Sequence, residues 1–263
     1  MNRKAVFFDI DGTLWDVNSV IPESTIEAIH SLQKNGHRAF INTGRTRAFI
    51  RRPNLLGIGF DGICCGCGTL LEIDGKTEYY YRIPQDFAIY TVETIRKYHL
   101  RPVLEGRYNL FLDDGDFAED FFSMKLKEEM GSDLLTIKDH WGEWEISKLS
   151  CSTPQPEADV AACQKILGDR YQFMSHNPEV CELVPTGHNK ATIIDKVCER
   201  YDIDLADTIA IGDGVNDLEM LRHAGTGVAM GSGSDEAKEA ADLITTGLKE
   251  DGIMNAMKKL ELI

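Results

Sequence analysis

Residues 4–13 of the chain read KAVFFDIDGT. The apolar run after Lys4 is typical of a strand that is buried on both faces of a parallel sheet. The run ends in two carboxylates, Asp9 and Asp11, before Gly12 turns the chain. Alternation along a strand sends these two side chains to the same side, where they repel unless a cation or a shared proton offsets their charge. We therefore expect a functional site at this strand end; an Asx turn is the alternative.

Strand and helix patterns alternate after this first strand, and the same alternation returns late in the chain. A helix is expected over Ser24–Asn35, because apolar residues recur at helical spacing and Gly36 follows as a stop signal. A strand at Arg38–Ile41 and a helix at Thr46–Leu56 come next. After Pro185 the pattern predicts helices at 189–200, 216–223 and 235–241 and strands at 208–211 and 227–230. This alternation predicts a parallel sheet.

The central part of the chain has a different pattern of predicted elements. Strand-like runs at Leu70–Ile73 and Tyr79–Ile83 flank Asp74-Gly75, which is a hairpin signal. A helix at Asp86–His99 and several short strands follow. We therefore expect an α/β protein with a Rossmann-like parallel-sheet core, helices on both faces and an inserted α+β domain. The core comprises residues 1–81 and 185–263, and the insertion comprises residues 82–184.

Three more groups of polar residues fall at strand ends or helix starts. Asn42-Thr43-Gly44-Arg45 follows a predicted strand, where a hydroxyl and backbone N–H groups can hold an anion; a simple helix cap is the alternative. Residues 212–217 read GDGVND, and their carboxylate and amide oxygens suit Mg²⁺. Lys190 begins the helix after Pro185 and could add a positive charge, although a lone lysine is usually solvated.

Composition excludes several classes of function. The 263 residues carry 28 basic and 43 acidic side chains, a formal net charge of −15, which would repel a nucleic-acid backbone. No stretch reaches the ~18 apolar residues of a membrane helix, and the apolar run near the N-terminus is too short for a signal peptide. We therefore expect a cytoplasmic protein that binds neither nucleic acid nor membrane.

Cysteine and tryptophan residues offer two further candidates. Among seven cysteines, Cys64 and Cys67 have the C-x-x-C spacing of a redox or zinc half-site, but no second pair follows at zinc-ribbon distance. Buried thiols in a short strand are the favoured interpretation. Packing in a core or cap is the favoured interpretation of the tryptophans, and Trp15, a few residues past Asp11 in the sequence, is the one candidate for lining a substrate entrance.

The four groups, in this order, resemble the motifs of the haloacid dehalogenase-like (HAD) phosphatase superfamily. Asp9-Ile10-Asp11-Gly12-Thr13 resembles its first motif, Thr43-Gly44-Arg45 its second, Lys190 its third and residues 212–217 its fourth. The late insertion and the Glu250-Asp251-Gly252 segment are similar to the Cof-type subfamily. That subfamily carries an α+β cap, a substrate-specificity domain, between the second and third motifs.

The resemblance implies Mg²⁺-dependent hydrolysis of a small phosphorylated metabolite, such as a sugar phosphate. Asp9 would form an aspartyl phosphate, and Asp11 would serve as general acid and base. Mg²⁺ would be held by Asp9, the Asp11 backbone carbonyl and Asp213. Asp217 would not bind the metal directly but would orient its water ligands or Lys190. The phosphate group would be bound by Thr43, Gly44, Lys190 and Asn216. A phosphomutase or phosphotransferase with the same phosphoaspartate, and a non-catalytic module that binds phosphate compounds, remain alternatives.

Overall fold

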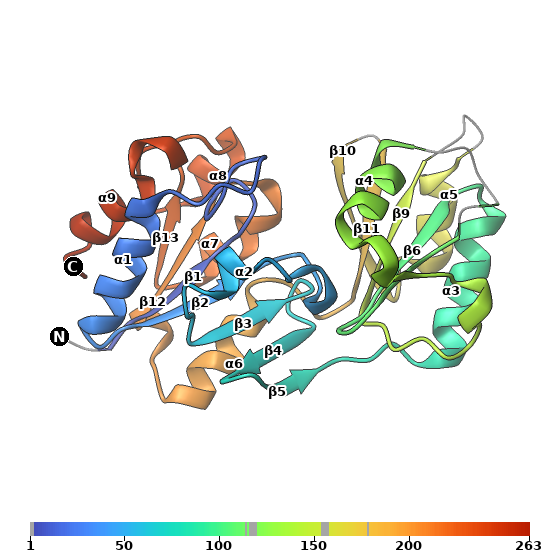
Figure 1. Ribbon diagram of the computed structural model, residues 1–263, viewed down its shortest axis with the longest axis horizontal. Helices are drawn as coiled ribbons and strands as arrows, with labels where there is room; N and C mark the ends of the chain where they lie inside the picture. Colours follow the sequence, from blue (N-terminus) through green and yellow to red (C-terminus); the bar gives the residue numbers. More distant parts are fainter. Residues whose placement is uncertain (1–2, 114, 116–119, 154–157, 178) are drawn as a thin grey trace. The chain divides into compact units, whose positions relative to one another are not determined.

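The computed structural model describes residues 3–113, 115, 120–153, 158–177 and 179–263. The chain divides into two compact units (Figure 1). Unit 1 contains residues 1–44, 51–79 and 188–263, and unit 2 contains residues 45–50 and 80–187. In the part of the chain that the structure describes, no helix has the length and apolar character needed to cross a membrane.

Unit 1 is built on an eight-stranded sheet with the order β14-β13-β12-β1-β2-β3-β4-β5. The strands from β14 to β3 run parallel, and β4 pairs antiparallel with β3. All residues of β1 are buried, as its unbroken apolar sequence predicts. The strands are β1 (Ala5–Phe8), β2 (Arg38–Asn42), β3 (Gly62–Cys65), β4 (Leu70–Ile73), β5 (Lys76–Tyr80), β12 (Thr208–Gly212), β13 (Thr226–Ala229) and β14 (Leu243–Ile244).

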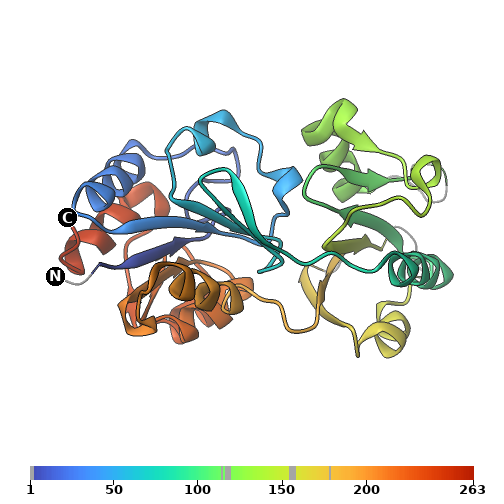
Figure 2. The ribbon, with the colours of Figure 1, turned by 90° about the horizontal axis from the view of Figure 1, so that it is seen from below.

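Helices cover both faces of this sheet (Figure 2). On one face lie α1 (Glu23–Lys34) and α9 (Gly252–Lys259), which contact each other. On the other lie α6 (Thr192–Tyr201) and α7 (Leu218–His223), with α8 (Asp235–Ala240) beside α7. The apolar core on this second face joins Phe7 and Phe40 to Ile193 of α6 and Leu221 of α7. The prediction of a parallel α/β core is confirmed.

β1 lies between β2 and β12, at the centre of the sheet. The chain moves from β1 toward β2 and β3 in its first part and adds β12, β13 and β14 on the opposite side in its last part. The order of the strands therefore reverses at β1 and β12. In open α/β sheets such a reversal leaves a crevice at the carboxyl ends of the strands, where ligands bind.

Two predicted elements are wrong in detail. The helix expected over Thr46–Leu56 is instead a 3₁₀ turn at Arg47–Phe49 and a separate short helix, α2 (Pro53–Leu56). Pro53 has no N–H to donate and disfavours helical geometry at Arg52, whose backbone is extended. The strand expected over Tyr79–Ile83 is β5, which begins at Lys76 because Asp74 and Gly75 form a tight turn with positive φ angles.

Unit 2 contains a six-stranded, mostly antiparallel sheet with the order β10-β11-β9-β6-β7-β8. One face packs against α3 (Gln85–Lys97) and α5 (Val160–Leu167), the other against α4 (Phe121–Met130). The strands are β6 (Arg101–Glu105), β7 (Leu110–Leu112), β8 (Leu134–Leu135), β9 (Lys148–Ser152), β10 (Tyr171–Asn177) and β11 (Val180–Pro185). This unit is the inserted α+β domain.

Residues 45–50 belong to unit 2 by their contacts, although the expected core, residues 1–81, includes them. The Arg45 guanidinium lies 2.8 Å from a carboxylate oxygen of Glu129 on α4, and the Ala48 N–H donates to the carbonyl of Gly106. These contacts, rather than the position of the segment in the sequence, assign residues 45–50 to unit 2.

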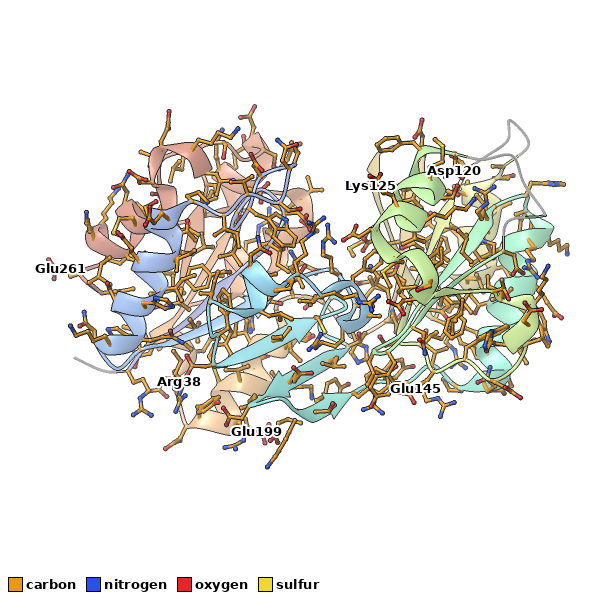
Figure 3. All side chains as sticks on the ribbon, in the orientation of Figure 1. Arg38, Asp120, Lys125, Glu145, Glu199 and Glu261 are labelled. Carbon is orange, nitrogen blue, oxygen red and sulfur yellow. The ribbon has the colours of Figure 1, made fainter. Side chains whose placement is uncertain are left out.

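Charged side chains such as Lys125, Glu199 and Glu261 lie at the outside of the molecule (Figure 3), where they are solvated by water.

Candidate active site

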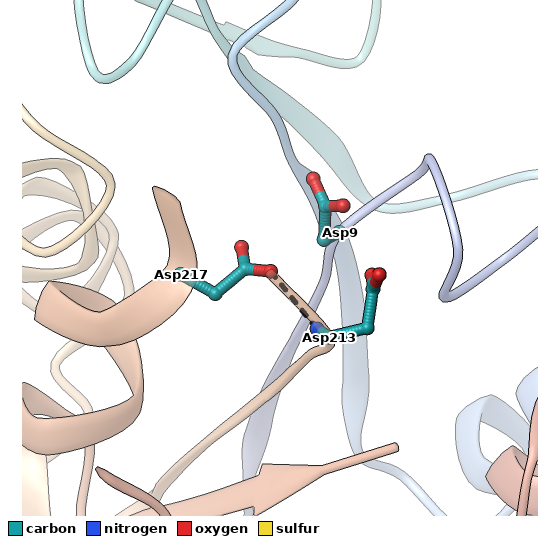
Figure 4. Close-up of side chains that lie close together, drawn as sticks. All are labelled: Asp9, Asp213 and Asp217. Carbon is teal, nitrogen blue, oxygen red and sulfur yellow. Dashed lines mark hydrogen bonds between the residues drawn. The ribbon is translucent and has the colours of Figure 1, made fainter. Parts of the chain in front are cut away.

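Carboxylates that follow two neighbouring strands meet at the centre of the unit 1 sheet. Asp9 comes directly after β1 and Asp213 directly after β12, and the Asp9 N–H donates to the carbonyl of Ile211 at 3.0 Å. Asp9, Asp213 and Asp217 each place a carboxylate oxygen within 4.8 Å of the others (Figure 4). The strand reversal therefore brings together residues that lie about two hundred positions apart in the sequence.

Two glycines allow this close approach. A Cβ on Gly12, whose φ is +88°, would lie 2.2 Å from Oδ2 of Asp213. A Cβ on Gly212 would lie 2.5 Å from the carboxyl carbon of Asp217. No other residue type fits at either position without moving a carboxylate, because non-bonded carbon and oxygen atoms do not approach so closely.

Lys190 is buried against the carboxylates. Its Nζ lies 2.6 Å from Oδ1 of Asp9 and 2.6 Å from Oδ1 of Asp217, and the residue is 1% exposed. Burial alone would lower the pKa of this ammonium group, but the attraction of Asp217 and Asp9 outweighs burial and raises it. Lys190 is therefore charged, and the solvated-lysine interpretation is wrong.

Asp9 experiences strong opposing influences. Burial raises its pKa well above the usual value, and Lys190 counteracts this effect. The charges of Asp217, Asp213 and Asp11 raise the pKa of Asp9 further. The Asp9 carboxylate thus needs positive charge nearby to remain ionised, and it is 3% exposed.

Asp213 and Asp217 are held by different partners. Oδ2 of Asp217 accepts a hydrogen bond of 2.9 Å from the N–H of Asp213 (Figure 4). The same oxygen accepts a second bond of 2.9 Å from the N–H of Gly214, and Oδ1 accepts from Lys190. Both oxygens of Asp217 are thus engaged by N–H donors. Oδ1 of Asp213 accepts a hydrogen bond of 2.8 Å from the Thr13 hydroxyl. Burial raises the pKa of Asp213 to about 6, and the Thr13 hydrogen bond opposes the rise.

The second group of polar residues lies at the same edge of the sheet. β2 pairs in parallel with β1, so Thr43 and Gly44 follow β2 at the edge where Asp9 follows β1. The buried Thr43 is fixed through its backbone, because its N–H donates to Cys64 and its carbonyl accepts from Cys67. The Asn42 amide donates to the carbonyl of Lys190 at 2.8 Å, which ties this strand end to the lysine.

Asn216 lies in the 3₁₀ turn Val215–Asp217, between the strand end at Gly212 and α7. It is partly exposed, whereas Asp217 in the same turn is fully buried. The turn therefore points one side chain into the carboxylate group and leaves the other accessible to a ligand. This division was not readable from the sequence GDGVND, in which both residues are polar.

Asp11 is separated from the other carboxylates. It is exposed, and it is absent from the group formed by Asp9, Asp213 and Asp217. The Trp15 indole Nε1–H donates to Oδ1 of Asp11 at 2.9 Å. Trp15 is 2% exposed, which agrees with core packing and not with a place at a substrate entrance. Trp15 and Asp11 are four residues apart in the sequence, but their side chains meet only because the chain turns tightly between them. The sequence did not reveal this turn.

Cys64 and Cys67 are both buried. Burial raises the pKa of the Cys64 thiol well above its usual value, which disfavours the thiolate needed for metal binding or redox chemistry. Among the described residues, neither cysteine joins a group arranged to hold a metal ion. Their backbone groups support Thr43 instead.

A cavity of about 530 Å³ opens beside Asp213 within unit 1. Its lining includes Gly12, Ser232 and Leu248, contributed by three separate segments. Of these residues, only Gly12 belongs to a motif that the sequence had singled out for chemistry. The cavity reaches the carboxylate group through Asp213 alone, because neither Asp9 nor Lys190 lines it.

Comparisons with known proteins agree with this geometry. A family model described as haloacid dehalogenase-like hydrolase matches residues 6–257. The 5-amino-6-(5-phospho-D-ribitylamino)uracil phosphatases YcsE and YitU of Bacillus subtilis (strain 168) are similar in sequence. YcsE is 38% identical over 260 residues, 97% of this chain and 94% of its own. YitU is 28% identical over 278 residues, 97% and 96% of the two chains.

Solved structures are similar along the whole chain. A HAD subclass IIB sugar phosphatase, BT4131, superposes with a TM-score of 0.82 at 28% sequence identity and covers 99% of this chain and 100% of its own. A hypothetical protein from Geobacillus kaustophilus HTA426 has a TM-score of 0.84 at 28% identity, with complete coverage of both chains.

Proposed function

The chain belongs to the haloacid dehalogenase-like hydrolases and is a phosphoric monoester hydrolase, and we propose that it works through an aspartyl phosphate on Asp9 with Mg²⁺ as cofactor. The observation that carries the proposal is the buried Lys190 ammonium between Asp9 and Asp217. Burial raises the pKa of Asp9, and Lys190 opposes that rise, which favours the ionised carboxylate that a nucleophile needs to attack phosphorus.

Asp9 attacks the phosphorus atom of the ester, and the bond from phosphorus to the leaving oxygen breaks as the bond to the Asp9 oxygen forms. Asp11 donates a proton to that leaving oxygen. In the second step Asp11 takes a proton from a water molecule that attacks the aspartyl phosphate, which releases inorganic phosphate and restores both side chains. The exposed position of Asp11 supports this role, because the leaving alcohol and the water both arrive from solvent.

The residues at the site fit a divalent cation. Asp9 and Asp213 are hard oxygen donors that lie close together, and burial raises the pKa of both, so a cation would relieve their repulsion. We assign Asp9, the Asp11 backbone carbonyl and Asp213 as ligands of Mg²⁺, whose positive charge offsets the repulsion between the nucleophile and the phosphate. Asp217 orients Lys190 and the Asp213 backbone, because both of its oxygens already accept N–H donors.

The phosphate oxygens are bound by Thr43, the Gly44 N–H, Lys190 and Asn216. Support comes from the fixed backbone of Thr43 beside Cys64, from the tie between Asn42 and Lys190, and from the partial exposure of Asn216. Positioned donors of this kind stabilise the charge that develops on a transferring phosphoryl group.

The substrate is a small phosphorylated metabolite, and a phosphate ester on a sugar or sugar-alcohol chain is favoured. YcsE and YitU act on a phosphoribityl compound, and BT4131 is a sugar phosphatase, so three relatives take phosphate from a polyhydroxylated carbon chain. We assign selection among such compounds to the inserted domain, residues 82–184.

The proposal is tested by phosphate release from 4-nitrophenyl phosphate and a panel of sugar and sugar-alcohol phosphates. Turnover should require Mg²⁺, stop in excess chelator and disappear in Asp9→Asn, which keeps the size of the side chain but removes the nucleophile. Absence of turnover on every ester, or full activity of Asp9→Asn, would overturn the assignment. A phosphomutase would interconvert two phosphosugars faster than it releases phosphate.

A further inference from the structure

The two aspartates of the first motif must do different work at a shared cation site. Asp9 belongs to the carboxylate group with Asp213 and Asp217, whereas the side chain of Asp11 does not. A second flexible carboxylate so near the site would be drawn to any bound divalent cation, since carboxylates are its preferred ligands. Some contact must therefore hold the Asp11 side chain in its separate position.

Trp15 supplies that contact from an anchored position. Its backbone N–H donates to the carbonyl of Ile10 at 3.1 Å, and its carbonyl accepts from the Gly12 N–H at 2.9 Å, so the chain turns tightly between Asp11 and Trp15. The residue is almost fully buried, and the Arg52 guanidinium carbon lies 5.8 Å from the centre of its ring. Backbone, burial and a neighbouring cation thus all fix the indole.

The indole has a single polar group, the Nε1–H, and it donates to Oδ1 of Asp11 at 2.9 Å. A buried indole N–H requires an acceptor, and a carboxylate gains from a donor, so each group stabilises the other. A leucine or phenylalanine at position 15 would fill the same space but could not hold the carboxylate.

We propose that Trp15 is a positioning residue that ties one oxygen of Asp11 and holds the carboxyl group away from Asp9 and Asp213, where it meets the leaving oxygen of the substrate. The inference rests on the proposed role of Asp11 as general acid and base. Because Trp15 is 2% exposed and its N–H donates to Asp11, its role is to position that carboxyl group.

The test compares Trp15→Phe, which keeps the ring and removes the N–H, with wild type in single turnovers with enzyme in excess. Under these conditions release of the leaving group reports the first step alone. Phenoxide is a poorer leaving group than 4-nitrophenoxide and depends more on a proton from Asp11. Trp15→Phe should slow phenol release from phenyl phosphate at least about tenfold, but 4-nitrophenol release from 4-nitrophenyl phosphate less than about threefold.

Trp141→Phe is the matched control, because Trp141 is 42% exposed and lies in unit 2. It should keep the wild-type ratio of the two release rates. A Trp15→Phe enzyme with that same ratio would overturn the inference, even if both rates fell together, because general damage to the fold does not discriminate between leaving groups. Wild-type turnover and its loss in Asp9→Asn would in that case still support the proposed function.

A second measurement needs neither metal nor turnover. The chain has three tryptophans, Trp15, Trp141 and Trp144, so its indole N–H signals in a ¹H–¹⁵N spectrum can be assigned by single Trp→Phe variants. In Asp11→Ala, which removes the acceptor, the Trp15 indole signal should shift while the other two stay in place. An unmoved Trp15 signal would show that the hydrogen bond is absent and would overturn the inference, whatever the outcome of the kinetics.

Discussion

The Nζ atom of Lys190 lies 2.6 Å from a carboxylate oxygen of Asp9, and both residues are buried. Asp9 follows the first strand and Lys190 precedes a helix that begins after the inserted domain, so only the folded sheet brings them together. Their pairing offsets the cost of burying each charge, and Asp217 shares the same ammonium group.

Replacement of Lys190 by methionine should destabilise the protein and abolish catalysis. Removal of one partner leaves Asp9 and Asp217 buried without compensation, which costs about 3–5 kcal/mol in comparable cases. We expect this loss in the free energy of unfolding by urea without metal, together with a fall in kcat of about 100-fold or more. Lys125→Met is the matched control, since Lys125 is exposed. A Lys190→Met protein as stable as this control would contradict the pairing.

Replacement of Gly12 by alanine should damage the site beyond the effect of backbone strain. The new Cβ would lie 2.2 Å from Oδ2 of Asp213, so that carboxylate must move. Gly36→Ala is a close control, because Gly36 has the same φ of +88° but nothing within 4 Å of its Cβ position. Both variants should lose about 1–2 kcal/mol from the left-handed backbone, and only Gly12→Ala should lose activity. Equal activities would contradict the close approach to Asp213.

Replacement of Thr13 by valine should weaken the response to Mg²⁺. The Thr13 hydroxyl donates to Oδ1 of Asp213 and opposes the rise in the pKa of that carboxyl group. Without this donor, the Mg²⁺ concentration that gives half-maximal turnover should rise about tenfold, as expected for loss of a hydrogen bond to a charged group. Thr13→Ser keeps the hydroxyl and should restore most of the response. If serine and valine behaved alike, packing rather than the hydrogen bond would explain the effect.

The dependence of stability on pH should include a contribution from His37. Its Nδ1 accepts a hydrogen bond of 3.0 Å from the Lys4 N–H, and burial, with the nearby Lys4 charge, lowers its pKa below 6.5. The neutral ring is favoured in the folded state, so this contribution is complete above the unfolded pKa and is lost as the pH falls through the lower folded pKa. His37→Gln does not titrate in this range.

Urea unfolding at about pH 7.5 and about pH 5.5 measures this contribution. The difference in unfolding free energy between wild type and His37→Gln should favour wild type at the higher pH and decrease at the lower pH. A difference that stays constant would show that His37 titrates identically in the folded and unfolded states.

The local sequence predicted the elements that build the sheet, because apolar runs and turn residues act over a few positions. β1 at Ala5–Phe8 and the hairpin turn at Asp74-Gly75 are formed where alternation and turn chemistry predict them. The helix over Thr46–Leu56 fails because Pro53 interrupts it and because contacts with Glu129 and Gly106 hold residues 45–50 in unit 2.

The sequence likewise predicted which polar residues form the site but not how these residues are arranged in space. Asp9, Lys190 and Asp213 stand out by their places at strand ends and at a helix start. Their distances could not be predicted, since the strand order and the parallel register decide which ends meet. The charge of Lys190 shows the difference, because a lone lysine is solvated by default and is buried here only through its two carboxylate partners.

By itself, the sequence determined the fold class, the family resemblance and the kinds of residues that could carry phosphoryl chemistry. Such information lies in short patterns, and KAVFFDIDGT is the strongest of them. The tertiary structure alone decided that Asp217 faces Lys190 while Asn216 stays accessible, and that Trp15 holds Asp11 instead of lining an entrance. These relationships depend on directions of side chains within turns, and a turn acquires its direction only when the sheet and helices around it are in place.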